Sequence, residues 1–345
     1  MRILVAGGSG FIGSNFIYYY LKRNPRAEII NIDKLTYAGN LDNLTPLFNK
    51  SHPYNKRHFF IKGDIATNKK VEEIFKTFKP DCVINFAAES HVDRSIQNSK
   101  LFIKTNIQGT QVLLDASRRN EISKFIQIST DEVYGTLGPK GKFRENHPLL
   151  PNSPYSASKA GADLLVRSYY ETYKLPVIIT RSSNNYGPYQ FPEKLIPLFI
   201  TNAVYDWPLP LYGDGMNVRD WLYVEDNCEA ISLILEKGKE GEIYNIGGKC
   251  EKTNLEITIT ILKHLKKPET LIKFVKDRPG HDRRYALDIN KIGNELGWQP
   301  KFSFETGIKK TLEWYLKNRS WWEKIKSGKY LTYYKKFYKE VHNFV

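Results

Sequence analysis

The sequence contains little cysteine and no cluster of metal-binding residues. Its 345 residues include three cysteines, Cys82, Cys228 and Cys250, which are too few and too scattered to predict a disulfide framework. No group of cysteines and histidines has zinc spacing, and the seven histidines form no H-x-x-x-H pair. We therefore expect no metal site.

Long hydrophobic runs are also missing. No stretch of 18 apolar residues occurs, and the first residues pass directly into a strand-like run, so we expect no membrane span and no signal peptide. A content of 41% hydrophobic and 13% aromatic residues is typical of a globular protein. The length suggests about two domains. We expect a soluble, cytoplasmic protein.

Lysine and arginine outnumber the acidic residues, and the net charge is +15. A basic protein can bind nucleic acid. The bias is strongest in residues 301–345, which hold 11 Lys or Arg and four Asp or Glu among many aromatic residues. A packing face surrounded by lysines is indicated by the helical spacing of the aromatic residues at 330, 333, 334, 337 and 338. We therefore interpret this tail as packing surface and expect no nucleic-acid partner.

A glycine-rich turn follows the first predicted strand. The apolar run 2–6 leads into Gly7, and Gly10 and Gly13 follow at a spacing that permits a tight turn and close approach of a pyrophosphate. Gly8, Gly10 and Gly13 also satisfy the G-x-G-x-x-G pattern. The helix that begins here would offer free N–H groups and a partial positive charge. The turn predicts a dinucleotide site.

Acidic residues end the next strands. The strand predicted over 28–32 ends in Asp33, twenty residues beyond Gly13, where a carboxylate would accept hydrogen bonds from the adenosine ribose. Its charge would repel a 2′-phosphate, so NAD is favoured over NADP. Asp64 follows the third strand and is expected near the adenine, although a carboxylate that caps its own loop is the alternative.

Strands and helices alternate through the first half of the chain. Such alternation predicts an α/β fold with a Rossmann-type, doubly wound parallel sheet. The predicted strands are 2–6, 28–32, 58–62, 82–86, 124–128 and 176–180, and the helices include 68–79, 99–119 and 154–173. A smaller, discontinuous C-terminal domain is expected because Pro, Gly and aromatic residues replace this pattern from about 186, and a further strand comes at 242–246. We place the first domain at 1–185 with a returning segment near 220–248, and the second at 186–219 and 249–345.

A hydroxyl, an acid and a base follow the fifth predicted strand, as Thr130, Asp131 and Glu132. Tyr155 and Lys159 are four residues apart on a predicted helix and share a face, where a cation would lower the tyrosine pKa. Because ligands of open α/β sheets bind at the carboxyl ends of the strands, we expect these five residues to form one site. Such a site could take a proton from a sugar hydroxyl. A solvated turn and a chance surface pair are the alternative.

Together these motifs resemble those of the extended short-chain dehydrogenase/reductase family and, within it, the nucleoside-diphosphate-glucose 4,6-dehydratases, the dTDP-glucose type best of all. The resemblance runs from Met1 to at least Trp314. It rests on the segments 33–41, 87–95, 129–135, 181–190, 217–221 and 278–285. The pair Asp131 and Glu132 resembles the retaining glucose-type dehydratases, whereas 4-epimerases of this family generally lack it.

This resemblance implies a mechanism with tightly bound NAD that is regenerated in each turnover. Tyr155, helped by Lys159, would remove the C4 hydroxyl proton, with Thr130 hydrogen-bonded near O4. Glu132 would be the general base at C5, and Asp131 the acid at the C6 hydroxyl. The product would be the 4-keto-6-deoxyglucose nucleotide used for deoxysugars such as rhamnose. The residues leave dTDP-glucose and UDP-glucose both open as substrates.

The resemblance also implies binding residues. NAD would contact Gly7, Gly10, Phe11, Ile12, Gly13, Asp33, Lys34, Leu35, Thr36, Asp64, Ile65, Phe86, Ala87, Ala88, Ser90, Thr105, Tyr155, Lys159 and Asn185. The sugar nucleotide would contact Glu89, Ser90, Thr130, Asn184, Lys194, Leu195, Tyr212, Arg219, Asn254, Arg278 and His281, which makes the second domain the sugar-nucleotide domain. Guanidinium forks suit a diphosphate, although ion pairing of Arg219 and Arg278 with Asp220 or Asp282 is the alternative.

We expect a homodimer, because in this family helices corresponding to 99–119 and 154–173 pair in a four-helix bundle. One tyrosine of the C-terminal tail is expected to reach the nucleotide. Two alternatives stay open, a 4-epimerase of the same family and a catalytically inactive NAD-binding regulator. Such a regulator would be expected to lose some of Thr130, Asp131, Glu132, Tyr155 and Lys159, and all five are present.

Overall fold

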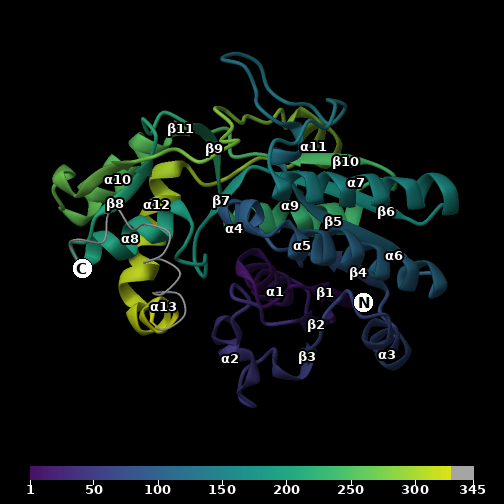
Figure 1. Cartoon of the computed structure of the whole chain (residues 1–345). Coiled ribbons are helices and arrows are strands. Elements are labelled where there is room, and N and C mark those ends of the chain that lie inside the picture. Colours follow the sequence, from purple (N-terminus) through teal and green to yellow (C-terminus); the bar gives the residue numbers. More distant parts are fainter. Residues whose placement is uncertain (328–345) are drawn as a thin grey trace.

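A seven-stranded parallel sheet forms the centre of the computed structural model, which describes residues 1–327 (Figure 1). The strand order is β10-β6-β5-β4-β1-β2-β3, the doubly wound order in which the winding direction reverses between β1 and β4. The predicted Rossmann-type sheet is confirmed. The bounds are β1 (Arg2–Ala6), β2 (Glu28–Asp33), β3 (His58–Lys62), β4 (Cys82–Asn85), β5 (Lys124–Thr130), β6 (Val177–Ser182) and β10 (Ile243–Ile246).

Helices cover both faces of this sheet. One face carries α1 (Phe11–Arg23), α9 (Val224–Lys237) and α11 (Asn290–Leu296), and the other carries α3 (Asn68–Phe78), α6 (Gly109–Arg119) and α7 (Pro154–Tyr173). Successive strand residues enter opposite cores, since Ile3 and Val5 pack with the first group whereas Leu4 and Ala6 pack with the second. Burial on both faces explains the continuous apolar runs of the strands.

The helix predicted over 99–119 is widened in its middle. It consists of α5 (Ser99–Phe102), the π-helical turn η3 (Ile103–Gln108) and α6. Within η3 the buried Asn106 accepts a hydrogen bond from the Glu89 N–H at 2.9 Å and donates to the Glu89 carbonyl at 3.1 Å. It also donates to Ser158 Oγ on α7 at 2.8 Å. The π turn therefore ties the segment after β4 to α7.

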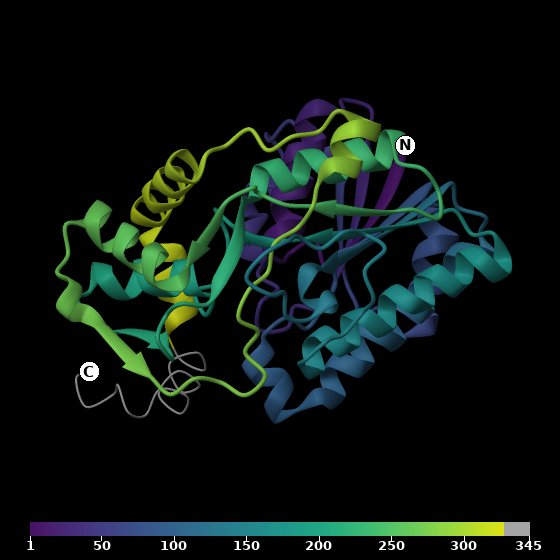
Figure 2. The same ribbon diagram turned by 90° about the horizontal axis from the view of Figure 1, so that it is seen from above.

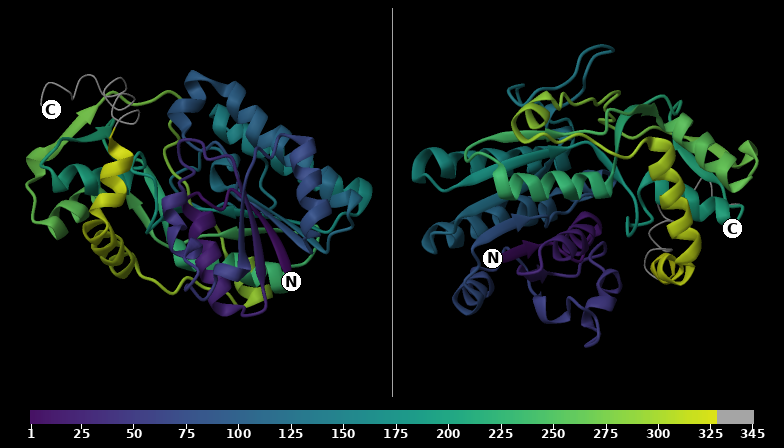
Figure 3. Two further views of the ribbon diagram at one scale, coloured as in Figure 1. Left: turned by 90° about the horizontal axis from the view of Figure 1, so that it is seen from below. Right: turned by 180° about the vertical axis from the view of Figure 1, so that it is seen from behind.

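A further set of elements builds a smaller lobe beside the sheet (Figures 2 and 3). A three-stranded sheet contains β7 (Asn184–Tyr186), β9 (Val218–Tyr223) and β11 (Glu251–Thr253), and a two-stranded sheet contains β8 (Leu209–Tyr212) and β12 (Ile272–Val275). Its helices are α8 (Leu195–Val204), α10 (Asn254–Leu265), α12 (Phe304–Lys317) and α13 (Arg319–Lys326). The short element η5 (Glu269–Leu271) precedes β12, whereas the other short elements follow strands of the main sheet: η1 (Leu41–Asn43), α2 (Thr45–Phe48), η2 (Asn55–Arg57), α4 (Val92–Gln97) and η4 (Asp131–Tyr134).

The two-domain division stays a prediction, and three observations bear on it. β10 pairs with β6 of the main sheet, and α9 packs on α1, as a returning segment requires. β9 pairs instead with β7 and β11 in the separate sheet. The predicted aromatic face at 330–338 and the tail tyrosines lie outside the described residues.

Residues 1–327 contain neither a candidate membrane-spanning helix nor a candidate metal-binding cluster. No helix in this range is long and apolar enough to cross a membrane. No three histidine, cysteine or acidic side chains come together there as a possible metal site.

A buried histidine makes stability depend on pH. His58 begins β3 and is 6% exposed, and neither of its ring nitrogens has a hydrogen-bond partner among the described residues. Burial lowers its pKa from 6.5 to about 4. Because the unfolded chain binds this proton more strongly than the folded chain does, acidification from pH 6.5 to about 4 favours unfolding.

We expect His58→Phe to remove about 3 kcal/mol of this acid-induced loss in the free energy of unfolding. Urea unfolding at several pH values between 7.5 and 4 measures the difference between the variant and the parent. His264→Gln is the control, because His264 is exposed. Equal pH dependence in His58→Phe and the parent would contradict the prediction.

Candidate active site

A cavity opens at the carboxyl ends of β1, β2, β4 and β5, where the winding of the sheet reverses. Every residue predicted to contact the cofactor lines it, except Leu35 and Asn185. These lining residues are Gly7, Gly10, Phe11, Ile12, Gly13, Asp33, Lys34, Thr36, Asp64, Ile65, Phe86, Ala87, Ala88, Ser90, Thr105, Tyr155 and Lys159. The sequence argument missed Gln190, Phe191 and Glu193, which come from the segment before α8.

The glycine turn leaves room for a phosphate. A Cβ on Gly7, which has φ of +77°, would lie 2.6 Å from the Ala87 main chain, and one on Gly13 would lie 2.5 Å from the Gly7 carbonyl. A Cβ on Gly10 would meet only that same carbonyl, at 3.3 Å, so this position is open toward the cavity. No side chain caps α1, whose first N–H groups therefore remain available. The turn fits the pyrophosphate of a dinucleotide.

Asp33 ends β2 inside the cavity. Its Oδ2 accepts from the Ser9 N–H at 2.9 Å, and its Oδ1 accepts from the Leu35 N–H at 2.8 Å. Burial raises the pKa of this carboxyl, and the two hydrogen bonds oppose the rise. Each oxygen keeps a free lone pair for a ribose hydroxyl. Leu35 turns the loop with φ of +57° and contributes through its main chain, which explains why its side chain does not line the cavity.

Asp64 has the features of both predicted roles, a contact near the adenine and a cap of its own loop. It lines the cavity, and its Oδ1 also accepts from the Ala66 N–H at 3.0 Å, which is a loop-capping contact. Burial alone would raise its pKa, but Lys34, with Nζ 2.8 Å from Oδ2, holds the pKa below the usual value. A charged carboxylate is therefore held beside the predicted adenine position.

A second cavity adjoins the first and contains most of the residues predicted to bind the sugar nucleotide. Glu193 and Lys194 line both cavities, so the two meet there. The predicted residues in the second cavity are Asn184, Lys194, Leu195, Tyr212, Arg219, Asn254, Arg278 and His281. Glu89 and Ser90 line the first cavity instead, and Thr130 lines neither.

The sequence argument missed much of the wall of this second cavity. His91 and Asp93 lie within the motif segment 87–95 and could have been found from it. Val92, Trp221 and Tyr285 likewise lie within the motif segments 87–95, 217–221 and 278–285. The rest of the apolar part carries no motif, because it comes from the separate elements α8 and β8: Leu198, Phe199, Pro210 and Leu211.

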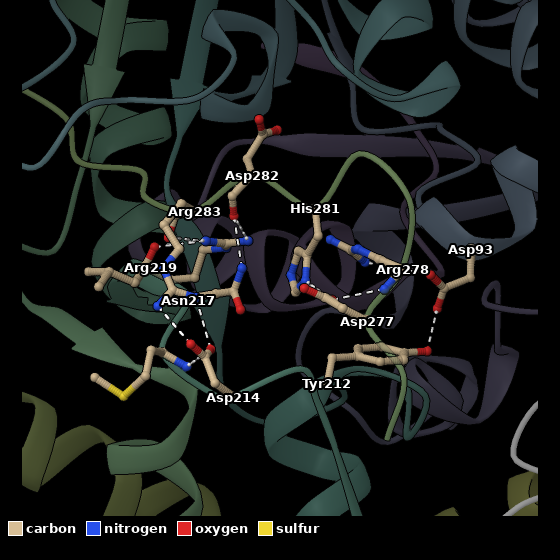
Figure 4. Close-up of polar contacts among 12 residues, drawn as sticks. Asp93, Tyr212, Asp214, Asn217, Arg219, Asp277, Arg278, His281, Asp282 and Arg283 are labelled. Carbon is tan, nitrogen blue, oxygen red and sulfur yellow. Dashed lines mark hydrogen bonds and ion pairs between the residues drawn. The ribbon is translucent and has the colours of Figure 1, made fainter. Parts of the chain in front are cut away.

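Two arginines bring positive charge to this cavity (Figure 4). Arg219 Nη2 donates to the main-chain carbonyl of Asp282 at 2.9 Å. Arg278 Nη1 lies 3.7 Å from Asp93 Oδ1, and its Nε has no hydrogen-bond partner among the described residues. Neither guanidinium pairs with the carboxylate of Asp220 or Asp282, so that alternative is wrong. Both guanidinium groups can therefore donate hydrogen bonds to an anion.

His281 lies beside these arginines as a neutral ring. Its Nδ1 is 2.6 Å from Asp277 Oδ1. Burial, followed by repulsion from Arg278 and Arg219, lowers its pKa to about 4. At neutral pH it can therefore serve as a hydrogen-bonding and stacking group near Tyr212, whose ring centroid is 6.1 Å away.

The acid and the base lie on η4, at the end of β5. Thr130 caps this turn, since its Oγ1 accepts from the Glu132 N–H at 3.3 Å, and it donates to Asp131 Oδ1 at 3.2 Å. Asp131 is 2% exposed, and its Oδ2 has no hydrogen-bond partner among residues 1–327. Burial, and then Glu132, raise its pKa well above the usual value. Burial also raises the pKa of Glu132, but Arg278, Lys194 and Arg219 oppose the rise. Of the two carboxyls, Asp131 is therefore the one that more readily keeps a proton.

Tyr155 stands in the first turn of α7, which a Ser153–Ser156 capping box and Pro154 fix in place. Burial, and then Glu132, raise the pKa of Tyr155 far above its usual value, although a hydrogen bond with Thr130 lowers it. Contrary to the prediction, the net pKa of Tyr155 is raised in this structure, and Lys159 is not among the main causes.

The ammonium group of Lys159 is engaged elsewhere. Its Nζ donates to the Ile128 carbonyl at 2.6 Å. Burial lowers its pKa to about 8, and the nearby Asp163 carboxyl opposes the decrease. Lys159 nevertheless lines the same cavity as Tyr155, where its charge can act on a bound cofactor.

Comparisons with known proteins agree with this geometry. The family model described as GDP-mannose 4,6-dehydratase matches residues 4–311. A dTDP-glucose 4,6-dehydratase from Xanthomonas campestris is 51% identical in an alignment that covers 95% of this chain and 96% of that protein. The crystal structure of a Bacillus anthracis dTDP-glucose 4,6-dehydratase in complex with NAD is 50% identical, with a TM-score of 0.87, and the match covers 94% of this chain and 99% of that one.

A Thermotoga maritima UDP-glucose 4-epimerase is more distant. Its structure with UDP-glucose has a TM-score of 0.85 and 30% sequence identity, and the match covers 92% of this chain and all of that one. The fold is therefore shared with epimerases, whereas the higher identities are to dehydratases. The chain belongs to the sugar-nucleotide dehydratase family that the GDP-mannose 4,6-dehydratase model describes and, within it, groups with the dTDP-glucose 4,6-dehydratases.

Proposed function

We propose that this protein dehydrates a nucleoside-diphosphate glucose, dTDP-glucose foremost, to the 4-keto-6-deoxyglucose nucleotide with NAD as its cofactor. One observation carries the proposal. Asp131 and Glu132 are adjacent, and their surroundings favour a proton on Asp131 more than on Glu132, where Arg278, Lys194 and Arg219 favour the charged form. An acid and a base on one turn beside Tyr155 suit an elimination.

The reaction begins at C4 of the sugar. NAD, held by the glycine turn and Asp33, would supply the hydride chemistry, accepting a hydride from C4 and returning it to C6. Tyr155, whose phenolate the positive charges of Lys159 and of the NAD ring would favour against the effect of burial, takes the proton of the C4 hydroxyl. The Thr130 hydroxyl hydrogen-bonds near the same oxygen. Lys194 and the two arginines hold the diphosphate, so that C4 faces Tyr155.

Elimination follows, because the 4-keto group acidifies the C5 proton. Glu132 removes that proton, and Asp131 protonates the C6 hydroxyl, which leaves as water. Glu132 then returns a proton to C5. The net change is the loss of one water with no net oxidation.

One proton must also pass between the two halves of the site. After the last step of the reaction, Tyr155 has gained one proton from the substrate, and Asp131 has given one proton to the leaving water. Thr130 hydrogen-bonds to Tyr155 and donates to Asp131 Oδ1, so its hydroxyl joins the two groups. This contact gives the proton a route back to Asp131.

The proposal is tested by incubating the purified protein with dTDP-glucose and, separately, with UDP-glucose. The alkali-induced absorbance of a 4-keto product should appear, and more rapidly with the thymidine nucleotide. A 4-epimerase would instead give the galactose nucleotide without that absorbance. A non-catalytic NAD-binding regulator would give neither product.

We also propose that the protein is a homodimer built on a four-helix bundle. The segment α5–η3–α6 and helix α7 lie side by side along one outer face (Figures 2 and 3). Three large apolar side chains on these helices are exposed: Leu101 at 48%, Ile103 at 53% and Leu164 at 58%. A second copy would remove this apolar surface from water.

Light scattering is expected to give twice the chain mass, and Leu164→Glu to shift the mass toward one chain. Leu316→Glu is the control, because Leu316 is 45% exposed on α12 of the other lobe. A monomeric parent with full activity would contradict the dimer.

A cytoplasmic location is the remaining proposal. All three cysteines are free, and Cys82 and Cys228 are buried thiols. Unpaired cysteines are typical of a reducing compartment. Cell fractionation of the host tests this location.

A further inference from the structure

The last helix of the smaller lobe, α13, contacts the loop behind the cofactor cavity. The indole N–H of Trp321 donates to Oδ1 of Asn43 at 2.9 Å, across 278 positions of sequence. Asn43 ends η1 and is 1% exposed. This hydrogen bond and an exposed ion pair between Lys324 Nζ and Asp42 Oδ2, at 2.6 Å, join the C-terminal part of the described chain to the segment that follows β2.

Every polar group of Asn43 forms a hydrogen bond. Its side-chain Nδ2 donates to the Ser9 carbonyl at 3.0 Å. Its main-chain N–H donates to Asn40 at 3.1 Å, and its carbonyl accepts from the Tyr18 hydroxyl at 3.1 Å. Replacement of this side chain would leave the buried Ser9 carbonyl and the partly buried Trp321 indole without the hydrogen bonds that they form with it.

Ser9 connects this loop to the ribose-binding acid. Ser9 is fully buried within the glycine turn, and its carbonyl accepts from both Asn43 Nδ2 and the Asn40 N–H. Its own N–H donates to Asp33 Oδ2 at 2.9 Å. The main chain of Ser9 therefore holds both ends of the loop 33–43, and residues of that loop line the cavity.

Helix α13 is itself firmly anchored in the smaller lobe. Trp322 is 1% exposed, and its indole donates to the Tyr315 carbonyl at 2.9 Å. The buried Lys326 donates to Asn202 Oδ1 at 2.7 Å and to Thr201 Oγ1 at 3.0 Å on α8. The Trp321 indole is therefore presented to Asn43 from a fixed position.

We propose that Asn43 is a positioning residue for the cofactor and that Trp321, acting through it, slows cofactor release. Ser9, Asn43 and Trp321 do not line the cavity, so they act through Asp33 and the glycine turn. Retention matters because the proposed reaction takes a hydride and returns it within one turnover. The inference rests on the proposed cofactor, NAD.

The test is Trp321→Phe, which keeps an aromatic ring and removes the N–H donor. Protein preloaded with radiolabelled NAD is chased with excess unlabelled NAD, and we expect release to be roughly fivefold to tenfold faster than in the parent. Single-turnover oxidation at saturating NAD is expected to stay at the parent rate, since no group at the reacting atoms changes.

Trp314→Phe is the matched control. Its ring centroid lies 5.0 Å from that of Trp321 in the same aromatic cluster, but no hydrogen bond from its indole N–H to residues 1–327 is found. We expect it to release NAD at the parent rate. Equal acceleration in both variants would show that ring packing, and not the hydrogen bond to Asn43, controls release, and would overturn the inference.

A double-mutant cycle tests whether Trp321 acts through Asn43. Asn43→Ala should release NAD faster than Trp321→Phe, and the double variant no faster than Asn43→Ala alone. Additive effects, an unchanged release rate in Trp321→Phe, or a lower unfolding temperature without faster release would each count against the inference. If the parent protein itself neither carries nor binds NAD, the proposed function fails instead.

Discussion

Asp131→Asn is expected to slow the overall dehydration by about 10²- to 10⁴-fold, the usual cost of losing a positioned acid or base. The side chain keeps its size and keeps an oxygen for the Thr130 hydroxyl, which donates to Asp131 Oδ1 at 3.2 Å. An amide cannot give a proton to the C6 hydroxyl. Oxidation at C4 depends on Tyr155 and should continue, so the two halves of the reaction should separate.

A single-turnover experiment distinguishes the two halves. With dTDP-glucose, the variant should accumulate the near-ultraviolet absorbance of reduced cofactor together with a 4-keto-glucose nucleotide that retains its C6 oxygen. Asp206→Asn is the control, because this exposed carboxylate pairs with Lys267 away from both cavities. Turnover of Asp131→Asn at the parent rate would remove Asp131 from the role of acid.

The sequence predicted those parts of the site that follow strand ends. Asp33 and Thr130 each close a parallel strand, and parallel strands bring their carboxyl ends to one edge of the sheet, so their proximity follows from topology. The glycine turn carries its own steric signature. These features are local in sequence, and the fold class alone then places them in space.

Other features of the site depend on tertiary contacts that no short sequence motif predicts. The pKa of Tyr155 was mispredicted because helical spacing gives the position of Lys159 but not its burial or its bond to the Ile128 carbonyl. The contact of Trp321 with Asn43 spans 278 positions. The π turn that places Asn106 also interrupts a pattern that reads as one regular helix.

The acid–base pair, Asp131 and Glu132, depends on both the sequence and the tertiary structure. Two adjacent carboxyls predict that one of them retains a proton, but not which one. The fold decides, because burial and Glu132 raise the pKa of Asp131 with Arg219 opposing, whereas Arg278, Lys194 and Arg219 all oppose the rise at Glu132. The direction of proton transfer in this site is therefore a property of the packed lobes.

Tyr155→Phe is expected to reduce C4 oxidation by about 10²- to 10⁴-fold, because the variant loses the group that takes the hydroxyl proton, and Lys159, the other titratable group of α7 in the first cavity, is engaged with the Ile128 carbonyl. The single-turnover signal of reduced cofactor should disappear, in contrast to its accumulation in Asp131→Asn. Tyr173→Phe is the control on the same helix, since Tyr173 is 51% exposed at its far end.

Loss of Tyr155 should leave the chemistry at C5 intact, and this makes the assignment testable apart from hydride transfer. When the 4-keto-6-deoxyglucose product is incubated with Tyr155→Phe in D₂O, Glu132 should still exchange the C5 proton for deuterium, because the 4-keto group is already present. Glu132→Gln should abolish that exchange. If Tyr155→Phe reduced the cofactor at the parent rate, or if it lost C5 exchange as completely as Glu132→Gln, Tyr155 and Glu132 would not divide oxidation and elimination between them, whatever the family to which the chain belongs.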